Sequence, residues 1–233
     1  MKTPTLPPSK LPEVGTTIFT AMSALASEHG ALNVAQGFPD LSPPTNLKEA
    51  VKKAIDEGYN QYAPMAGDPG LRAWISEMYN QEHGAFYNAD SEITIGAGAS
   101  SLLFASIQAL VFPGDEVIIV DPAYDLYAPA VHLAGGVITR AALPKPSSLG
   151  GPGGAIDAEV IRSLISDKTK LVIINAPHNP TGACFTSEGL NELADVLSES
   201  NCFLFSDEVY GPMNHDGRPF LSAAGHPGLK NRT

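Results

Sequence analysis

The chain has 233 residues, of which 43% are hydrophobic and 17% are charged, a balance that suits a globular protein with a sizeable apolar core. The formal net charge is −11, and a surface this acidic repels phosphate backbones, so we expect no nucleic-acid partner. No apolar run reaches membrane-spanning length, and two cysteines without a disulfide framework suggest a reducing compartment. These features predict a cytoplasmic protein without a membrane partner, with an organelle as the alternative location.

The chain opens with a proline-rich segment. Residues 3–12 hold four prolines, which favour an extended arm. Hydrophobic residues then recur at helical spacing in residues 46–58 and in residues 69–84, and each stretch ends in a glycine that can terminate a helix. We therefore expect two helices to follow the arm.

From residue 93 onward, short apolar runs alternate with helical patterns. The predicted strands are residues 93–95, 117–120, 137–139, 171–174 and 203–205. The predicted helices are residues 100–112, 124–134, a segment capped by Asp157 that runs to residue 165, and residues 187–197. This alternation predicts an α/β fold, a three-layer sandwich in which a mostly parallel sheet lies between two layers of helices.

Two stretches of the chain predict neither a helix nor a strand. Residues 144–154 are rich in Gly, Pro and Ser and are typical of a mobile surface loop without a function of its own. Residues 211–233 contain Gly, Pro and His but show no clear periodicity. No second core is therefore expected after residue 210.

A glycine-rich turn, residues 96–100, lies between a predicted strand and a predicted helix. Small residues there let backbone N–H groups at the helix start approach an anion, and the helix dipole favours negative charge at that end. The hydroxyl of Ser100 adds a further donor. By itself, the same pattern also fits a tight turn with Ser100 as an N-cap, and it lacks the third glycine of a dinucleotide-binding fingerprint.

Polar side chains follow three of the predicted strands at their carboxyl ends, where an open α/β sheet binds its ligand. Tyr124 comes after residues 117–120 and can stack on a planar ligand, although core packing is the better interpretation of this residue taken alone. Asn179 follows residues 171–174, while Asp207 and Tyr210 follow residues 203–205. A carboxylate at the inner end of a strand needs a partner, and a protonated ring nitrogen would serve. Together these groups can hold a flat heteroaromatic ring.

Several motifs in the chain resemble the fold-type I, pyridoxal-phosphate-dependent aminotransferases of class I/II. They are residues 98–100 (GAS), 121–124 (DPAY), 175–182 (NAPHNPTG) and 206–210 (SDEVY). Residues 35–40 (AQGFPD) and 61–64 (QYAP) resemble the methionine and kynurenine aminotransferase branch. The similarity runs from about residue 12 to about residue 219, and it implies the large domain of this fold, C-terminally incomplete.

The resemblance also implies roles for individual residues. Ala99 and Ser100 would bind the phosphate of pyridoxal 5'-phosphate, and Tyr124 would stack on its ring. Tyr62 would reach the phosphate in the neighbouring subunit, so that a homodimer is implied. Gly37 would line the pocket for the substrate carboxylate through its backbone, and no metal is expected.

Three further residues would hold the cofactor ring by the same resemblance. Asp207 would pair with the ring nitrogen, while Asn179 and Tyr210 would donate hydrogen bonds to the ring oxygen. The implied domains are an N-terminal arm with a small-domain segment, residues 1–45, and an incomplete cofactor-binding large domain, residues 46–233. The implied substrates are an amino acid of methionine, aromatic or kynurenine type and a 2-oxo acid.

The Schiff-base lysine of the family is missing from its expected place. In the family, this lysine lies in a Ser-x-x-Lys segment that follows the motif equivalent to the one with Asp207 and Tyr210. None of this chain's lysines has that context, so we expect the Schiff-base lysine beyond Thr233. Lys230 is nearest but is interpreted as a surface lysine. Three hypotheses follow, namely part of an aminotransferase, a non-catalytic short form that binds the cofactor or dimerises, and a carbon–sulfur β-lyase on the same scaffold. The open sheet edge further predicts that this chain alone aggregates.

Overall fold

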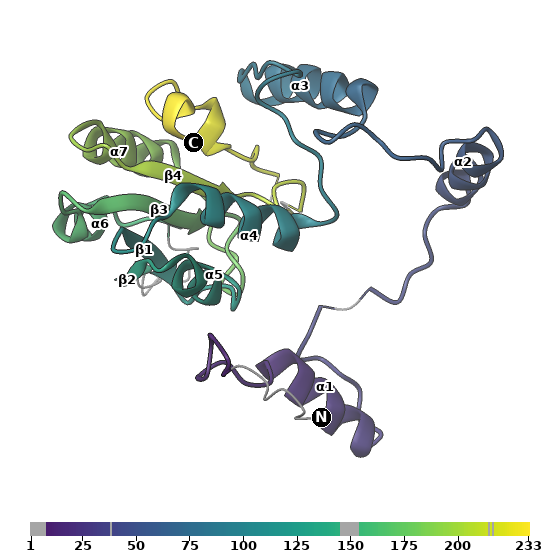
Figure 1. The fold of residues 1–233 in the computed structure, drawn as a ribbon, viewed down its shortest axis with the longest axis horizontal. Helices are drawn as coiled ribbons and strands as arrows, with labels where there is room; N and C mark the ends of the chain where they lie inside the picture. The colour runs from purple at the N-terminus through teal and green to yellow at the C-terminus, as the bar shows by residue number, and fades with distance from the viewer. Residues whose placement is uncertain (1–7, 38, 145–153, 214, 216) are drawn as a thin grey trace, which may run out of the picture.

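A central parallel sheet organises the structure. The computed structural model describes residues 8–37, 39–144, 154–213, 215 and 217–233. Within these residues, four strands, all parallel, lie in the order β2-β1-β3-β4, and Figure 1 shows them side by side. Their bounds are Glu116–Asp121 (β1), Val137–Ala142 (β2), Thr169–Asn175 (β3) and Phe203–Asp207 (β4). The order doubles back at β1 and β3, which is where open α/β sheets carry ligand sites.

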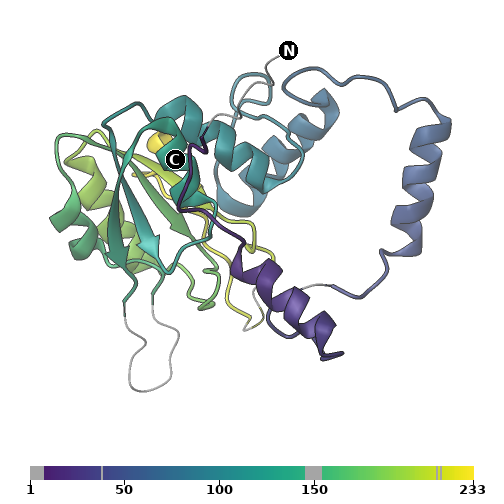
Figure 2. The same ribbon diagram turned by 60° about the horizontal axis from the view of Figure 1, so that its bottom comes forward.

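Helices cover both faces of this sheet (Figure 2). On one face, Val117 and Ile119 of β1 pack with α4 (Ala99–Leu110) and α5 (Tyr127–Ala134). On the other, Ile118 and Val120 pack with α6 (Ala158–Leu164) and α7 (Ser187–Ser198). Successive residues of a strand point to opposite faces, so a strand buried on both sides needs an unbroken apolar run. The predicted three-layer α/β sandwich with a parallel sheet is confirmed.

Short-range rules explain where most of these helices begin and end. The side chain of Asp68 accepts a hydrogen bond from Leu71 N at 2.8 Å and so caps α3 (Pro69–His83), which ends at Gly84 in the left-handed conformation. Asp157 caps α6 in the same way, as predicted, and Thr186 caps α7. Such caps satisfy backbone N–H groups that have no partner inside the helix.

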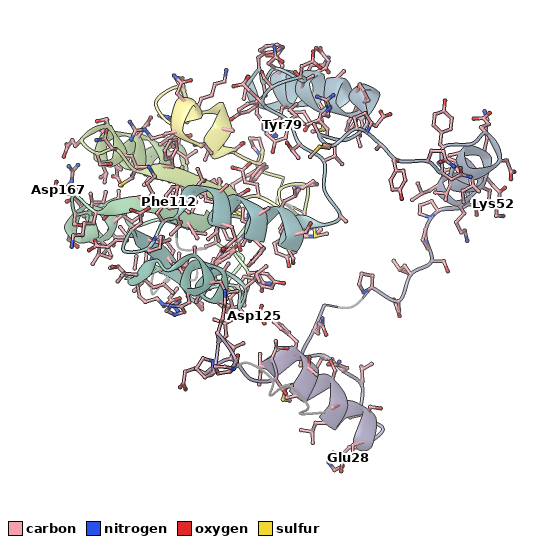
Figure 3. The ribbon with its side chains drawn as sticks, in the orientation of Figure 1. Glu28, Lys52, Tyr79, Phe112, Asp125 and Asp167 are labelled. Atoms are coloured by element: carbon pink, nitrogen blue, oxygen red, sulfur yellow. The ribbon has the colours of Figure 1, made fainter. Side chains whose placement is uncertain are left out.

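Two helices of the N-terminal part lie apart from the sheet. They are α1 (Ile18–Glu28), which the sequence pattern did not reveal, and α2 (Thr45–Asp56), and neither has a buried residue. Figure 3 shows Glu28 and Lys52, one on each helix, well away from the strands. The proposed domain boundary between residues 45 and 46 stays a prediction.

Two predicted elements differ from the structure. Residues 93–95 form no strand, although Ile95 N donates to Ala66 O at 2.9 Å. An extended segment becomes a strand only when another strand pairs with it, and no described strand lies alongside. The helix expected from residue 124 begins at Tyr127, because Tyr127 N donates to Tyr124 O and closes a turn first.

The C-terminal tail packs on the core despite its irregular sequence. It contains two short 3₁₀ turns, Ala223–Gly225 and Lys230–Arg232, and the side chain of Leu229 between them is fully buried. Arg232 Nη1 donates to the carbonyl oxygens of Ser200 and Cys202 at 3.0 and 3.2 Å. The tail is therefore fixed against the segment between α7 and β4. The predicted loop 144–154 falls almost wholly outside the described residues.

Candidate active site

The carboxyl ends of three strands bring the candidate residues to one edge of the sheet. β1 ends at Asp121, β3 at Asn175 and β4 at Asp207. Asn175 and Asp207 are direct partners in the register of β3 and β4. The loops that leave these strands carry Tyr124, Asn179 and Tyr210, so parallel pairing places side chains that are far apart in sequence next to one another.

The N-terminus of α4 presents unpaired backbone donors. No side chain caps this helix, and the N–H groups of Ala99, Ser100 and Ser101 have no acceptor among the described residues. Gly98 precedes the helix with φ 89° and ψ 154°, a conformation that only glycine adopts readily. The helix dipole adds partial positive charge at this end. This turn therefore suits an anion, but its predicted role at a phosphate stays a prediction. The alternative that Ser100 acts as its N-cap is wrong.

Tyr124 lies next to that helix start. Its hydroxyl is 3.4 Å from Ser100 Oγ, and its side chain is about one-third exposed. Its ring also meets the ring of Tyr127 edge to face, with centroids 5.8 Å apart. An aromatic ring held by one neighbour and open to solvent on another side can stack on a planar ligand.

Asp207 is a half-buried carboxylate with hydrogen-bond donors but no cation beside it. Its Oδ2 accepts from the hydroxyl of Tyr127 at 2.6 Å, and its Oδ1 accepts from Val209 N at 3.2 Å. Within the described ranges, no Lys, Arg or His forms an ion pair with it. Such a charge favours a cationic ligand group.

Asn179 and Tyr210 meet at the same edge. Asn179 Nδ2 donates to the hydroxyl of Tyr210 at 3.3 Å. Asn175 holds this arrangement, because its Oδ1 accepts from Asn179 N and its Nδ2 donates to Asp207 O, each at 2.8 Å. The amide and the phenol are thus placed to donate to one ligand oxygen.

His178 connects two of the loops. Its Nε2 lies 2.7 Å from Pro122 O, and its Nδ1 lies 2.8 Å from Thr181 Oγ1. Burial lowers the pKa of His178, and the hydrogen bond to Pro122 offsets this only in part. The sequence pattern did not identify His178, Asn175 or Tyr127, because the partners that define their roles come from other loops.

Other candidate residues stay apart from this edge. Tyr62 is fully exposed and Gly37 is exposed on the segment between α1 and α2, and neither forms a hydrogen bond to the residues above within the described structure. Their predicted roles stay predictions. Lys230 Nζ lies 5.6 Å from the ring centroid of Tyr87, so this lysine packs on an aromatic ring. It is half-buried, whereas the sequence predicted a fully solvated lysine.

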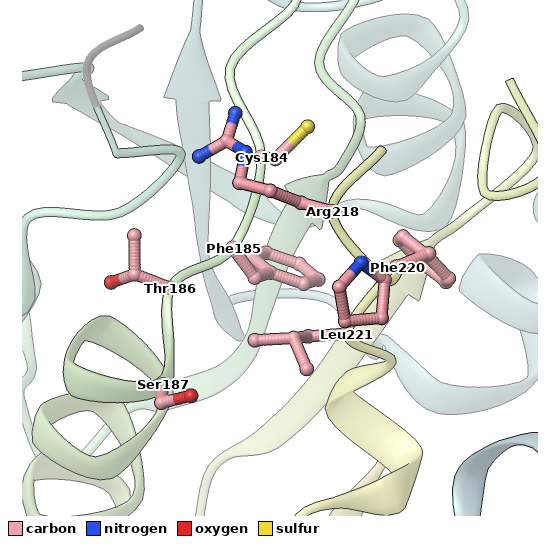
Figure 4. A pocket seen from close by; sticks show the side chains of 8 residues that line it. Cys184, Phe185, Thr186, Ser187, Arg218, Phe220 and Leu221 are labelled. Carbon is pink, nitrogen blue, oxygen red and sulfur yellow. The ribbon is translucent and has the colours of Figure 1, made fainter. Parts of the chain in front are cut away.

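A separate cavity lies between the start of α7 and residues 218–221 (Figure 4). Its volume is about 260 Å³, and its lining includes Cys184, Phe185 and Arg218. None of the predicted cofactor residues lines it. The strand-end edge is nevertheless the better candidate for the active site, because its described residues combine unpaired helix donors, an aromatic face and a carboxylate without a cationic partner.

Comparisons with known proteins show which family the chain resembles. Residues 30–232 match the family model of aminotransferase class I and II. The chain is 43% identical to the methionine aminotransferase of Escherichia coli over 98% of its length, and 37% identical to the kynurenine–oxoglutarate transaminase of Dictyostelium discoideum over 100%. The structure superposes on that of a methionine aminotransferase from E. coli with a TM-score of 0.90, covering 98% of this chain and 58% of the other.

A second solved structure gives the same result. The N-succinyldiaminopimelate aminotransferase of Mycobacterium tuberculosis is 36% identical, with a TM-score of 0.89 over 97% of this chain and 58% of that one. The chain spans 58% and 57% of the length of the two curated relatives above. The chain belongs to the class I and II aminotransferases.

Proposed function

We propose that this chain forms the cofactor-binding part of a pyridoxal-phosphate-dependent aminotransferase, which moves an amino group from an amino acid to a 2-oxo acid. The cofactor of this family is pyridoxal 5'-phosphate. The observation that carries the proposal is the half-buried Asp207, which has two hydrogen-bond donors and no basic partner in the described structure. The chemistry of the surrounding donors fits the same ligand.

Each part of the site would bind a different part of the cofactor. The N–H groups at the start of α4 and the Ser100 hydroxyl would bind its phosphate, and Tyr124 would stack on its ring. Asp207 would keep a proton on the ring nitrogen. When bound, the cofactor supplies an electron sink for the charge that develops at the substrate Cα.

The two remaining side chains of the edge would orient the ring. Asn179 Nδ2 and the Tyr210 hydroxyl, 3.3 Å apart, would both donate to the ring oxygen. Donors at the ring oxygen and an acceptor at the ring nitrogen would contact two different positions of the ring, which would fix its rotation in the plane. Positioning of this kind is a large part of what a protein contributes to cofactor chemistry.

The substrate side of the proposal rests on resemblance to relatives. Relatives bear the names methionine aminotransferase and kynurenine–oxoglutarate transaminase, which favours sulfur-containing or aromatic amino acids here. Gly37 would line the carboxylate pocket, and Tyr62 would reach the phosphate in a partner subunit of a cytoplasmic homodimer. The relatives compared above are described as aminotransferases, so they give no support to a carbon–sulfur β-lyase or to a non-catalytic form.

The resemblance also requires a Schiff-base lysine and arginines that bind phosphate and substrate carboxylate, and no lysine of this sequence has the expected context. We place them in the portion of the relatives' length that this chain does not span.

Within the described ranges, no helix is long and apolar enough to cross a membrane. Cys184 and Cys202 are both free thiols.

The protein isolated from its own source tests this proposal. Its intact mass is compared with 24.4 kDa, its bound cofactor is identified by mass spectrometry, and transfer from methionine and kynurenine to 2-oxo acids is assayed. We expect a larger mass, bound pyridoxal 5'-phosphate and turnover. A protein saturated with the cofactor that transfers no amino group from any amino acid tested would contradict the proposed function.

A further inference from the structure

Tyr127 lies directly behind the candidate site. It is the first residue of α5, and its side chain is 2% exposed. Although it packs within the apolar cluster between the sheet and α4, its hydroxyl donates to Asp207 Oδ2 at 2.6 Å, across 80 residues of sequence. A short hydrogen bond to a carboxylate is among the stronger ones that a protein makes. Tyr127 is thus fixed by apolar packing at its ring and by Asp207 at its hydroxyl.

The same residue also fixes Tyr124. The two rings meet edge to face, with centroids 5.8 Å apart and planes at 76°. The backbone adds a second connection, because Tyr127 N donates to Tyr124 O at 3.2 Å. Edge-to-face pairs of this kind have a preferred geometry, so the position of Tyr127 constrains that of Tyr124.

The direction of the hydrogen bond is determined by the chemistry of Tyr127. Burial, followed by the hydrogen bond to Asp207 and the charge of that carboxylate, raises the pKa of the Tyr127 phenol far above its usual value. The phenol therefore keeps its proton at neutral pH and acts as the donor to the Asp207 carboxylate. Since Val209 N donates to the other oxygen, the carboxylate of Asp207 is oriented from two sides.

We infer that Tyr127 is a positioning residue of the cofactor site, which sets the orientation of Asp207 at the ring nitrogen and the placement of Tyr124 against the ring face. It acts through these two residues and does not itself contact the ligand. The inference rests on the proposed function, because its ligand is pyridoxal 5'-phosphate. The sequence motifs do not include Tyr127 in the site.

The alternative is that Tyr127 is only a core residue that happens to have a satisfied hydroxyl. Both interpretations predict that removal of the hydroxyl lowers stability. Only the positioning role predicts that the loss of cofactor binding depends on Asp207. A double-mutant cycle over Tyr127→Phe and Asp207→Asn measures this dependence directly.

The experiment uses the protein in the form that its own source makes, freed of bound cofactor. It is titrated with pyridoxal 5'-phosphate, and the dissociation constant and the circular dichroism of the bound ligand are recorded. The variants are Tyr127→Phe, Asp207→Asn and the double variant. Tyr79→Phe is the matched control, because Tyr79 is a half-buried tyrosine of α3 whose ring packs on His83 and Tyr87. All are first compared by thermal melting without ligand.

We expect Tyr127→Phe to bind the cofactor roughly tenfold to hundredfold more weakly and to alter the ligand's dichroism, with Tyr79→Phe unchanged. In the Asp207→Asn background, the Tyr127→Phe change should have less than half of that effect on a logarithmic scale. Wild-type affinity and dichroism in Tyr127→Phe would overturn this inference but leave the proposed function standing. A loss of affinity of equal size in the wild-type and Asp207→Asn backgrounds would overturn the inference as well. A wild-type protein, in the form that its own source makes, that binds no pyridoxal 5'-phosphate would overturn the proposed function and this inference together.

A measurement on the wild-type chain covers the case in which Tyr127→Phe does not fold. A hydroxyl proton in a 2.6 Å bond to a carboxylate exchanges slowly and gives a proton resonance shifted downfield. The inference predicts that saturation with pyridoxal 5'-phosphate shifts this resonance, because the ring nitrogen approaches the same carboxylate. A resonance that stays in place at saturation would overturn it.

Discussion

His178 Nε2 lies 2.7 Å from the carbonyl oxygen of Pro122, and this contact joins the loop after β3 to the loop after β1. A carbonyl oxygen only accepts, so Nε2 carries the proton and Nδ1 of the neutral ring accepts from Thr181 Oγ1. One loop carries Asn179 and the other carries Tyr124. A buried histidine therefore connects the loops of two candidate cofactor residues, although its ring nitrogens contact neither of them.

The first prediction concerns the pH dependence of stability through His178. Because burial lowers its pKa in the folded state, the unfolded chain binds more protons below the usual value of about 6.5. The contribution of His178 to the free energy of unfolding is fully present above pH 6.5. It is lost as the pH falls from there toward the lower folded-state pKa. Through this residue, the free energy of unfolding changes by at most about 1.4 kcal/mol per pH unit.

Melting temperatures between pH 8 and pH 5 check this prediction. His178→Gln should show a flatter decline below about pH 6.5 than the wild type. His132→Gln is the control, because His132 is exposed on α5, and it should follow the wild-type curve. An unchanged decline in His178→Gln would show that another group causes it.

The second prediction concerns Asn175, which is 8% exposed and joins the backbones of Asn179 and Asp207. Asn175→Ala leaves the N–H of Asn179 without its acceptor and removes one of the donors to Asp207 O. We expect a loss of about 1–3 kcal/mol in the free energy of unfolding, measured by urea denaturation. The exposed Asn201→Ala should change it by less than about 0.5 kcal/mol. Equal stabilities of the two variants would contradict the structural role of Asn175.

The third prediction separates backbone conformation from side-chain volume at Gly98. A Cβ at this position meets no atom within 4 Å, but φ is +89°. Gly98→Ala should therefore cost about 1–3 kcal/mol through strain alone and weaken binding of pyridoxal 5'-phosphate at the start of α4. Gly15→Ala is the matched control, because Gly15 has equal space and no positive φ. Chemical denaturation and ligand titration measure both effects, and a Gly98→Ala chain with wild-type values in both would refute the prediction.

The fourth prediction concerns the apolar layer between the sheet and α7. The side chain of Leu193 is fully buried there, whereas that of Leu47 on α2 is 54% exposed. Leu193→Ala should lower the free energy of unfolding by about 2–5 kcal/mol, because the cavity it leaves is refilled only in part. Leu47→Ala should have a much smaller effect. A similar loss in the two variants would mean that α2 contributes to the core, contrary to the structure.

The sequence predicted those features that local rules determine. The apolar run of β1 and the cap at Asp157 appear in the structure at the expected places, and the three-layer α/β arrangement follows from their order. The carboxyl-end rule also brought Asp207 and Asn179 to the same sheet edge. These predictions need only short-range patterns and one topological rule.

The remaining features depend on partners distant in sequence. Nothing in the local sequence distinguishes Tyr127 from other residues at a helix start. Its proposed role follows only from its contact with Asp207, which lies 80 residues later in the chain. Residues 93–95 have a strand-like pattern, but pairing decides whether a strand forms, and the described sheet offers them no neighbour. Leu229 lies in a glycine- and proline-containing tail, yet it is fully buried because the tail packs back on α7.

A crystal structure of the protein with pyridoxal 5'-phosphate tests the central claim most directly. The account predicts the phosphate within hydrogen-bonding distance of the N–H groups of Ala99 and Ser100, the ring against Tyr124, and the ring nitrogen beside Asp207. A ligand bound elsewhere, for example in the cavity lined by Cys184 and Arg218, would contradict it. So would the absence of bound ligand at saturating concentration.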